Sequence, residues 1–156
     1  MEIKELTKEY FDKVAHLAII SISDLPYYNH KGKSSSISEF RIEKLEEKLV
    51  SENDKIFVAV EENNLLGCVR NVLDEDTLFI AWIFTDYRHR NKGFAKELLN
   101  RTIEFAKEKT CHKVWCDTRT NNKESIAFFT KMGFQNIAEL KNHWYGLDYY
   151  ILEKVI

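Results

Sequence analysis

Residues 78–109 read LFIAWIFTDYRHRNKGFAKELLNRTIEFAKEK, and this stretch decides the fold. Its first part, Leu78 to Phe84, is apolar at every position, which predicts a strand buried on both faces at the centre of a sheet. Its last part repeats apolar residues with the helical period to about Lys109. The inner face of that predicted helix consists of Phe94, Ala95, Leu98, Leu99, Thr102, Ile103 and Ala106.

The turn between this strand and this helix predicts a binding site for a phosphate group. Gly93 allows the main chain to approach a ligand closely, and the first N–H groups of the following helix have no partner within it. The helix dipole adds partial positive charge at the same end. Arg88, Arg90 and Lys92 add full positive charges, which favours a diphosphate. A plain turn with a solvated basic face is the alternative interpretation.

Downstream of the helix, Val114 to Thr118 forms a second predicted strand. A strand, a helix and a strand in succession predict that the two strands are parallel. Asn121 or Asn122 caps a short helix that Gly133 ends. The two closing strands are expected at Gln135–Leu140 and Leu147–Lys154.

Upstream, Met1 to Leu6 predicts a short strand, and Thr7 is the expected N-cap of a first helix. Asp24 to Ser35 contains the only proline, a glycine and serines, which predicts a mobile loop. Ser36 and Glu39 form a capping-box pattern for a second helix. That helix would bury Phe40, Leu45 and Leu49, and a hairpin of Ile56–Val60 with Leu65–Leu73 would follow. The order predicts a mixed α+β fold in a single domain, residues 1–156.

Composition limits the classes of function. The formal net charge is -2, which gives no general attraction to nucleic acid or to an anionic membrane, and the basic run from Tyr87 to Arg90 matches no nucleic-acid motif. No stretch approaches the ~20 apolar residues of a membrane span. The three cysteines form no C-x-x-C pair and no signal segment starts the chain, so a cytoplasmic protein is expected. Strand alternation separates Cys111, His112 and Cys116, so no metal site is expected.

Two motifs resemble the GNAT superfamily of acyl-CoA-dependent N-acetyltransferases. The glycine-rich signature [QR]-x-x-G-x-[GA] matches Arg90, Gly93 and Ala95. The pattern N-x-x-[AS]-x-x-x-Y-x-x-x-G-F matches Asn122, Ser125, Gly133 and Phe134, with Phe129 at the tyrosine position. The resemblance implies a GNAT-like fold, with a central, mostly antiparallel sheet of six to seven strands, a splayed parallel pair and about four helices.

The resemblance also implies a binding site for acetyl-CoA in the wedge between the two parallel strands. The main chain of Ile83, Phe84 and Thr85 would pair with the pantetheine arm, and the N–H groups from Arg90 to Lys96 would hold the pyrophosphate. Asn122 and Ser125 would approach the cofactor from the opposite strand end, beside Phe128 or Phe129. The residues expected around the diphosphate are Arg88, Arg90, Asn91, Lys92, Gly93, Phe94, Ala95 and Lys96.

The implied reaction is acetyl transfer to a primary amine by direct attack in a ternary complex, since no G-x-S-x-G or Cys/His nucleophile pattern occurs. Phe129 has no hydroxyl to protonate the leaving thiolate. Tyr145, Tyr149 and Tyr150 in the closing segments are candidates for that role. So is Cys116 or Asp117, whichever of the two faces the wedge, and the sequence does not choose among them.

The acceptor is a small-molecule or peptide amine that the sequence leaves unspecified. Tyr27 and Tyr28 are its candidate contacts, as are His30, Lys31 and Lys33. A catalytically weak acyl-CoA-binding or regulatory module is the alternative function, because Phe129 replaces the usual acid. A homodimer formed through the late strands is left open.

Overall fold

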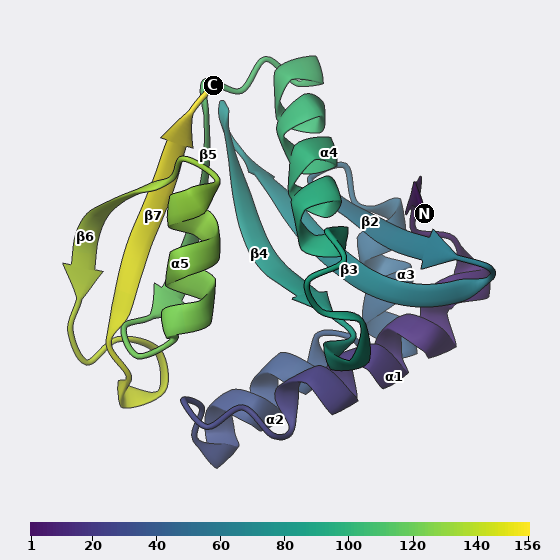
Figure 1. Ribbon diagram of the computed structural model, residues 1–156, viewed down its shortest axis with the longest axis horizontal. Helices are drawn as coiled ribbons and strands as arrows, with labels where there is room; N and C mark the ends of the chain where they lie inside the picture. The colour runs from purple at the N-terminus through teal and green to yellow at the C-terminus, as the bar shows by residue number, and fades with distance from the viewer.

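The computed structural model describes residues 1–156 and is built on a seven-stranded sheet in the order β1-β2-β3-β4-β5-β7-β6 (Figure 1). Every neighbouring pair is antiparallel except β4 with β5, which are parallel. The strands are β1 Glu2–Glu5, β2 Asp54–Glu61, β3 Asn64–Asp74, β4 Thr77–Thr85, β5 Lys113–Arg119, β6 Gln135–Leu140 and β7 Tyr149–Val155. The predicted mixed fold with one parallel pair is confirmed.

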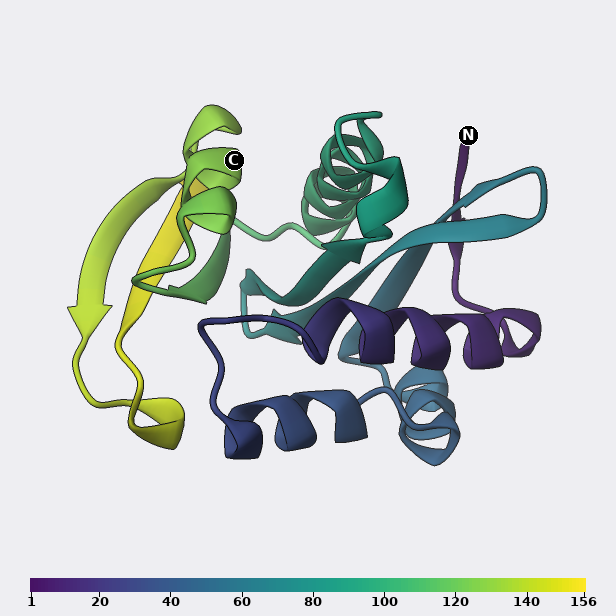
Figure 2. The same ribbon diagram turned by 60° about the horizontal axis from the view of Figure 1, so that its bottom comes forward.

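Helices cover both faces of the sheet (Figure 2). The helices α1, α2 and α3 lie on one face, and α4 and α5 lie on the other (Figure 1). Their bounds are α1 Phe11–Ile22, α2 His30–Ser38, α3 Ile42–Val50, α4 Phe94–Glu108 and α5 Lys123–Lys131, with short 3-10 turns η1 Lys8–Tyr10, η2 Tyr87–His89 and η3 Trp144–Gly146. Thr7, the expected N-cap of the first helix, precedes the turn η1, and its side chain forms no capping hydrogen bond. The last strand begins at Tyr149 and not at the predicted Leu147, because the turn η3 comes before it.

Each face of the sheet has its own apolar core. On the α4 side, Leu98, Leu99 and Phe105 pack against Leu78 and Val114. On the α1 side, the corresponding cluster contains Val14, Leu17, Ala18, Val58 and Cys68. Alternate residues of β2 enter the two cores, because side chains along a strand point to opposite faces. The central strands are thereby packed on both faces, so the strands that border a cleft are held in place by the two cores.

The prediction that Asp24 to Ser35 forms a loop is wrong from His30 onward, because α2 begins there. Asn29 caps this helix by accepting a hydrogen bond from the Gly32 N–H at 2.9 Å. Serines and glycine give α2 no apolar stripe, so its contacts with the rest of the protein stabilise it. The sequence could not show those contacts.

The predicted capping box is also wrong. Ser36 lies inside α2 and is buried, and α3 starts six residues later at Ile42. Phe40 is buried in the short connection between the two helices, as Leu45 is within α3, whereas Leu49 is 40% exposed. The chain therefore has five α-helices, one more than the pattern predicted.

Strand β4 is less buried than its apolar sequence predicted. Leu78 and Ile80 are buried, whereas Phe79, Trp82 and Ile83 are only partly buried. The register with β3 skips Ala81, which is a β-bulge, so the inward and outward positions exchange there. Beyond the bulge β4 has no partner on its β5 side. The open edge explains why an apolar strand is incompletely covered.

Candidate active site

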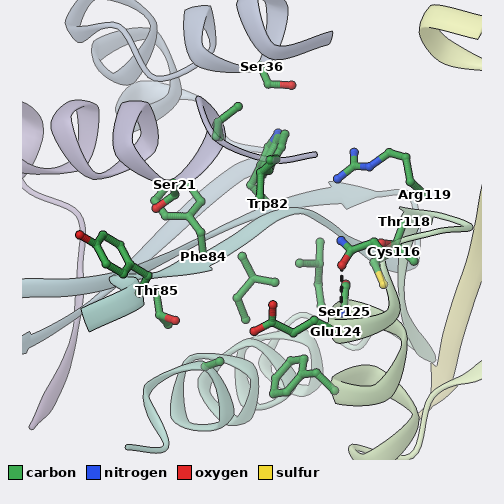
Figure 3. A pocket seen from close by; sticks show the side chains of 18 of the residues that line it. Ser21, Ser36, Trp82, Phe84, Thr85, Cys116, Thr118, Arg119, Glu124 and Ser125 are labelled. Carbon is green, nitrogen blue, oxygen red and sulfur yellow. Dashed lines mark hydrogen bonds between the residues drawn. The ribbon is translucent and has the colours of Figure 1, made fainter. Parts of the chain in front are cut away.

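The two parallel strands separate after a short paired segment. Thr77–Ile80 of β4 pair with Lys113–Cys116 of β5, and neither strand pairs with the other beyond these residues. A cavity of about 1710 Å³ extends through the opening, between the α4 turn and α5 on one side and the α1–α2 region and η3 on the other (Figure 3). Typical pockets for a single drug-sized ligand measure roughly 300–1,000 Å³. The cavity can therefore hold a large cofactor together with a second substrate.

The turn before α4 presents unpaired main-chain donors to this cavity. Gly93 has a φ of 88°, and a Cβ atom built on it would meet no atom within 4 Å. None of the backbone N–H groups from Asn91 to Lys96 donates to a backbone acceptor. These donors and the N-terminal end of a 15-residue helix form an anion-binding arrangement.

Asp86 fixes the start of this turn. Its carboxylate accepts hydrogen bonds from the backbone N–H of Arg88 at 3.0 Å and from the Arg88 guanidinium at 2.6 Å. The Arg88 hydrogen bond lowers the Asp86 pKa to about 2, against the opposing effect of burial. The side chain of Asp86 is almost completely buried. A permanently ionised carboxylate thus anchors one end of the donor turn.

The basic side chains of the turn lie at different distances from the cavity. Arg88, Arg90 and Lys96 line it, whereas Lys92 does not. Arg90 Nη1 lies 3.4 Å from a carboxylate oxygen of Glu124 on α5, so this ion pair links the two walls of the cavity. Both side chains are more than half exposed, which makes the pair weak and easily replaced by a ligand.

The N-terminus of α5 forms the opposite wall. Asn122 caps the helix, because its Oδ1 accepts from the Ser125 N–H at 3.1 Å (Figure 3). Phe129 is 2% exposed and packs edge-on against Phe134, while Phe128 is partly buried. Of the residues predicted to contact the cofactor, Lys92 does not line the cavity. The others all do: Ile83, Phe84, Thr85, Arg88, Arg90, Asn91, Gly93, Phe94, Ala95, Lys96, Asn122, Ser125, Phe128 and Phe129.

Strand β5 divides its side chains between the two faces. Cys116 belongs to the core on the α4 side, and burial raises the pKa of its thiol well above the usual value. Asp117 follows it and therefore faces the α2 side. Burial raises the Asp117 pKa to about 6, with the nearby Arg119 cation opposing the shift. Asp117 is thus a carboxylate that can exchange a proton near neutral pH, whereas Cys116 stays a neutral thiol.

Aromatic residues surround the end of β5. The Arg119 guanidinium carbon lies 3.7 Å from the centre of the Tyr28 ring, and its Nη1 donates a hydrogen bond to the Tyr28 hydroxyl. The rings of Tyr27, Trp82 and Tyr149 lie 5.3 to 5.9 Å from the same carbon. Figure 3 shows the Arg119 side chain reaching from β5 toward Trp82.

The tyrosines predicted near the reacting groups lie in the cavity wall. Tyr145 has a φ of 60°, and its hydroxyl donates to the Ser35 Oγ of α2 at 2.8 Å. Asn29 donates to the Tyr145 carbonyl oxygen at 2.9 Å, so α2 and η3 are joined twice. Tyr149 is 1% exposed, and burial raises its pKa while Arg119 opposes the shift. The Tyr149 phenol is therefore a protonated donor at neutral pH.

The acceptor candidates Tyr27 and Tyr28 also line the cavity, whereas His30, Lys31 and Lys33 do not. Sequence reasoning missed Trp82 and Arg119. Arg119 had a readable signal, because it follows Asp117 by two residues and strand alternation puts both on one face. Trp82 had none, since the bulge at Ala81 decides which way it points.

No cluster of three or more His, Cys, Asp and Glu side chains is arranged to hold a metal ion. No helix has both the length and the apolar surface that crossing a membrane requires.

Solved structures share this fold. An N-acetyltransferase named PaiA from Thermoplasma acidophilum, solved with coenzyme A, superposes with a TM-score of 0.83 at 18% identity, over 99% of this chain and 98% of that one. A ribosomal-protein-alanine N-acetyltransferase from Brucella melitensis superposes with a TM-score of 0.82 at 17% identity over the full length of both chains. At these identities the likeness concerns the fold alone.

Sequence relatives match about half of this chain. Human N-acetyltransferase 8 is 30% identical over 97 residues, which are 58% of this chain and 43% of that protein. The bS18-alanine N-acetyltransferase of Salmonella typhimurium is 31% identical over 74 residues, 47% of this chain and 48% of that protein. The matches span about half the length of these curated relatives.

The profile of the Acetyltransferase (GNAT) family matches residues 16–134, which include the Gly93 turn, both parallel strands and α5. The match covers more than half of the chain and most of the elements that line the cavity, but it ends before η3 and β7. The chain belongs to the GNAT acetyltransferase family.

Proposed function

We propose that this protein transfers the acetyl group of acetyl-CoA to a primary amine. The observation that carries the proposal is the row of unpaired backbone N–H groups from Asn91 to Lys96, at a helix N-terminus beside Gly93, opening onto a cleft between diverging strands. Such donors suit the pyrophosphate of coenzyme A, because charge-assisted hydrogen bonds contribute about 1.5–3 kcal/mol each. Two relatives carry N-acetyltransferase in their names, in keeping with this activity.

The cleft fits the rest of the cofactor as well. On its β5 side the edge of β4 from Ala81 to Thr85 is unpaired, so its main-chain groups are free to pair with the amide groups of pantetheine. Phe128 offers a partly buried apolar surface beside that path. The bound cofactor would supply an activated acetyl group as a thioester. The protein then needs to position the amine and handle its proton.

Asp117 is our candidate to receive the proton of the incoming amine. It lines the cavity and is deprotonated above about pH 6. Tyr149 and Tyr145 are candidates to donate a proton to the departing thiolate, because Phe129 cannot. Tyr149 is the stronger of the two, since the Tyr145 hydroxyl already donates to Ser35. Orientation of two bound reactants supplies effective molarities of roughly 10⁵–10⁸ M, so no covalent acyl-enzyme is needed.

A second candidate function is a weak acyl-CoA-binding or regulatory module. The observation in its favour is the Phe129 ring, buried in the core at the place where the family motif has a tyrosine. An enzyme and a binding module would share the cofactor site. They differ in turnover.

Turnover therefore separates the two functions. Thiol release from acetyl-CoA is measured with a panel of amines, and cofactor affinity is measured by calorimetry. Release well above the rate without amine supports the transferase, and tight binding without release supports the module. A burst of acetylated protein in rapid-quench experiments would contradict direct attack.

The setting of the protein is part of the proposal. We place the acetyltransferase domain in the reducing cytoplasm, supported by the three cysteines, which are all free and buried. The strand β6 is exposed along most of its length at the edge of the sheet, so a homodimer would pair through it. Light scattering at two concentrations tests the oligomeric state.

A further inference from the structure

Arg119 is a buried cation without a carboxylate partner. Its residue exposure is 9%, and its Nε is buried with no hydrogen-bond acceptor. Burial of an unpaired charge is unfavourable, and buried arginines are normally paired. The structure therefore has a buried cation with no carboxylate at ion-pair distance, although Asp117 is near enough for the Arg119 charge to lower its pKa.

The other arginines show what is normal in this protein. Arg70 is the most buried arginine that forms an ion pair. Its side chain is 17% exposed, and it contacts both Asp54 and Glu39. Arg88, Arg90 and Arg101 also form ion pairs, although they are more exposed. Two arginines form no ion pair, Arg119 and the exposed Arg41, so Arg119 is the one buried arginine without an anion at ion-pair distance.

The residues in direct contact with the Arg119 guanidinium are aromatic and neutral. The Tyr28 hydroxyl accepts from one guanidinium nitrogen, and burial keeps that phenol protonated by raising its pKa to about 12. The rings of Tyr27, Trp82 and Tyr149 supply weak cation–π contacts. These contacts position the guanidinium but do not neutralise it.

The cavity reaches Arg119 from the proposed reaction site. Arg119 and Asp117 both line the cavity and lie on the same face of β5. The two charges interact at a distance, since the Arg119 cation lowers the Asp117 pKa, but they do not form a direct ion pair. Two residues along a strand span about 6.8 Å, so a compact ligand can have one group at each. A cation site and an anion site thus lie side by side in one cavity.

We propose that the acceptor amine carries a carboxylate, and that Arg119 binds this carboxylate while Asp117 faces the amino group. This inference rests on the proposed acetyltransferase function and names its substrate class. A single carboxylate neutralises a single guanidinium, whereas a phosphate dianion would leave one negative charge uncompensated in a buried site. The shared chemistry is found in a free amino acid and in an acidic side chain at a peptide N-terminus.

The test compares matched acceptors. Each free amino acid is paired with its C-terminal amide and with its decarboxylated amine, and a glutamate-initiated peptide amide forms a separate arm. We expect kcat/KM to be at least 10-fold higher for the carboxylate-bearing acceptor of one arm than for the acceptors that lack a carboxylate. The arm with the higher kcat/KM, free amino acid or peptide, then identifies the source of the carboxylate. Equal or faster turnover of the decarboxylated amines would overturn the inference while leaving the transferase function intact.

Arg119→Met then tests the residue. Loss of one partner of a buried charge pair typically costs 2–5 kcal/mol, so we expect kcat/KM for the carboxylate-bearing acceptor to fall roughly 100-fold. Turnover of decarboxylated amines should fall by a much smaller factor, because these acceptors have no carboxylate to bind and lose only the effect of the Arg119 cation on the Asp117 pKa. The KM for acetyl-CoA should change less than about 3-fold. Arg119→Lys keeps the charge and should recover part of the loss. Arg41→Met, at an exposed arginine, is the matched control. Equal losses for both kinds of acceptor would contradict the assignment.

A binding measurement covers the case of absent turnover or a poorly folded variant. Binding of N-acetyl amino acids and of the matching N-acetyl amino acid amides to the wild-type protein with coenzyme A is measured by calorimetry. We expect the free carboxylate to bind at least 10-fold more tightly. Equal affinity, or no binding of either, would overturn the inference. Failure of coenzyme A itself to bind would instead count against the proposed function.

Discussion

The two ends of the cavity are built differently. At the cofactor end, main-chain N–H groups around Gly93 form the surface that a ligand would meet, and the nearby side chains are mostly exposed. At the other end, side chains of Tyr28, Trp82, Arg119 and Tyr149 form the surface, and they come from separate segments of the chain. Backbone donors bind any ligand with the right phosphates. Side-chain surfaces change with single substitutions, so acceptor choice can vary on a constant cofactor site.

The largest effect is expected for Gly93→Val, which changes the cofactor end of the cavity. A branched side chain would enter the open space beside the donor turn, and a φ of 88° is unfavourable for valine. Loss of the charge-assisted hydrogen bonds should weaken coenzyme A binding roughly 100-fold or more in calorimetry. Gly133→Val is the matched control, because Gly133 has a φ of 86° but does not line the cavity. Unchanged affinity in Gly93→Val would refute the diphosphate site.

Tyr149→Phe tests whether the side-chain end also serves the chemistry. If Tyr149 protonates the leaving thiolate, kcat should fall by about 100-fold while the KM for acetyl-CoA stays nearly constant. Tyr145→Phe is the comparison, and we expect a smaller loss there because the Tyr145 hydroxyl is already bound to Ser35. A larger loss in Tyr145→Phe would reverse the assignment.

Asp117→Asn should slow the reaction and stabilise the fold. In the wild type we expect the rate to rise with pH through about 6, as Asp117 loses its proton, and the variant should lose this limb. The folded pKa lies above the unfolded value of 3.8, so ionisation destabilises the folded protein as the pH rises from about 4 to about 6. The variant lacks that penalty and should gain roughly 1–3 kcal/mol at pH 7 in urea unfolding. A less stable variant would contradict burial as the cause.

Asp86→Asn should have the smallest effect, confined to the donor turn. The Asp86 pKa is lowered, so its ionised form stabilises the fold above about pH 4, and this contribution disappears as the pH falls toward about 2. At pH 7 we expect a loss of about 1–2 kcal/mol, seen as a lower melting temperature. Coenzyme A affinity should fall less than in Gly93→Val. A loss of affinity without a loss of stability would mean that Asp86 contacts the ligand directly.

The sequence by itself determined the order of the elements from β2 to β7, the parallel pair of strands and the donor turn at Gly93. Each of these depends on neighbours in the chain, since hydrophobic period, a glycine at a helix start and a cap such as Asn122 act within a few residues. The same local motifs carried the family resemblance. Errors arose where local signals were weak, as in α2, whose serines predict a loop until Asn29, Tyr145 and Ser35 are brought together.

Only the tertiary structure decided what lies at the acceptor end of the cavity. The bulge at Ala81 turns Trp82 toward α1 and α2, and the packing of α2 on η3 brings Tyr28 to Arg119 across 91 positions of sequence. No spacing rule connects residues so far apart, because their proximity results from the whole fold. Whether Arg119 has an ion-pair partner is likewise decided by its three-dimensional surroundings, because the order of charged residues along the chain does not show which of them come into contact.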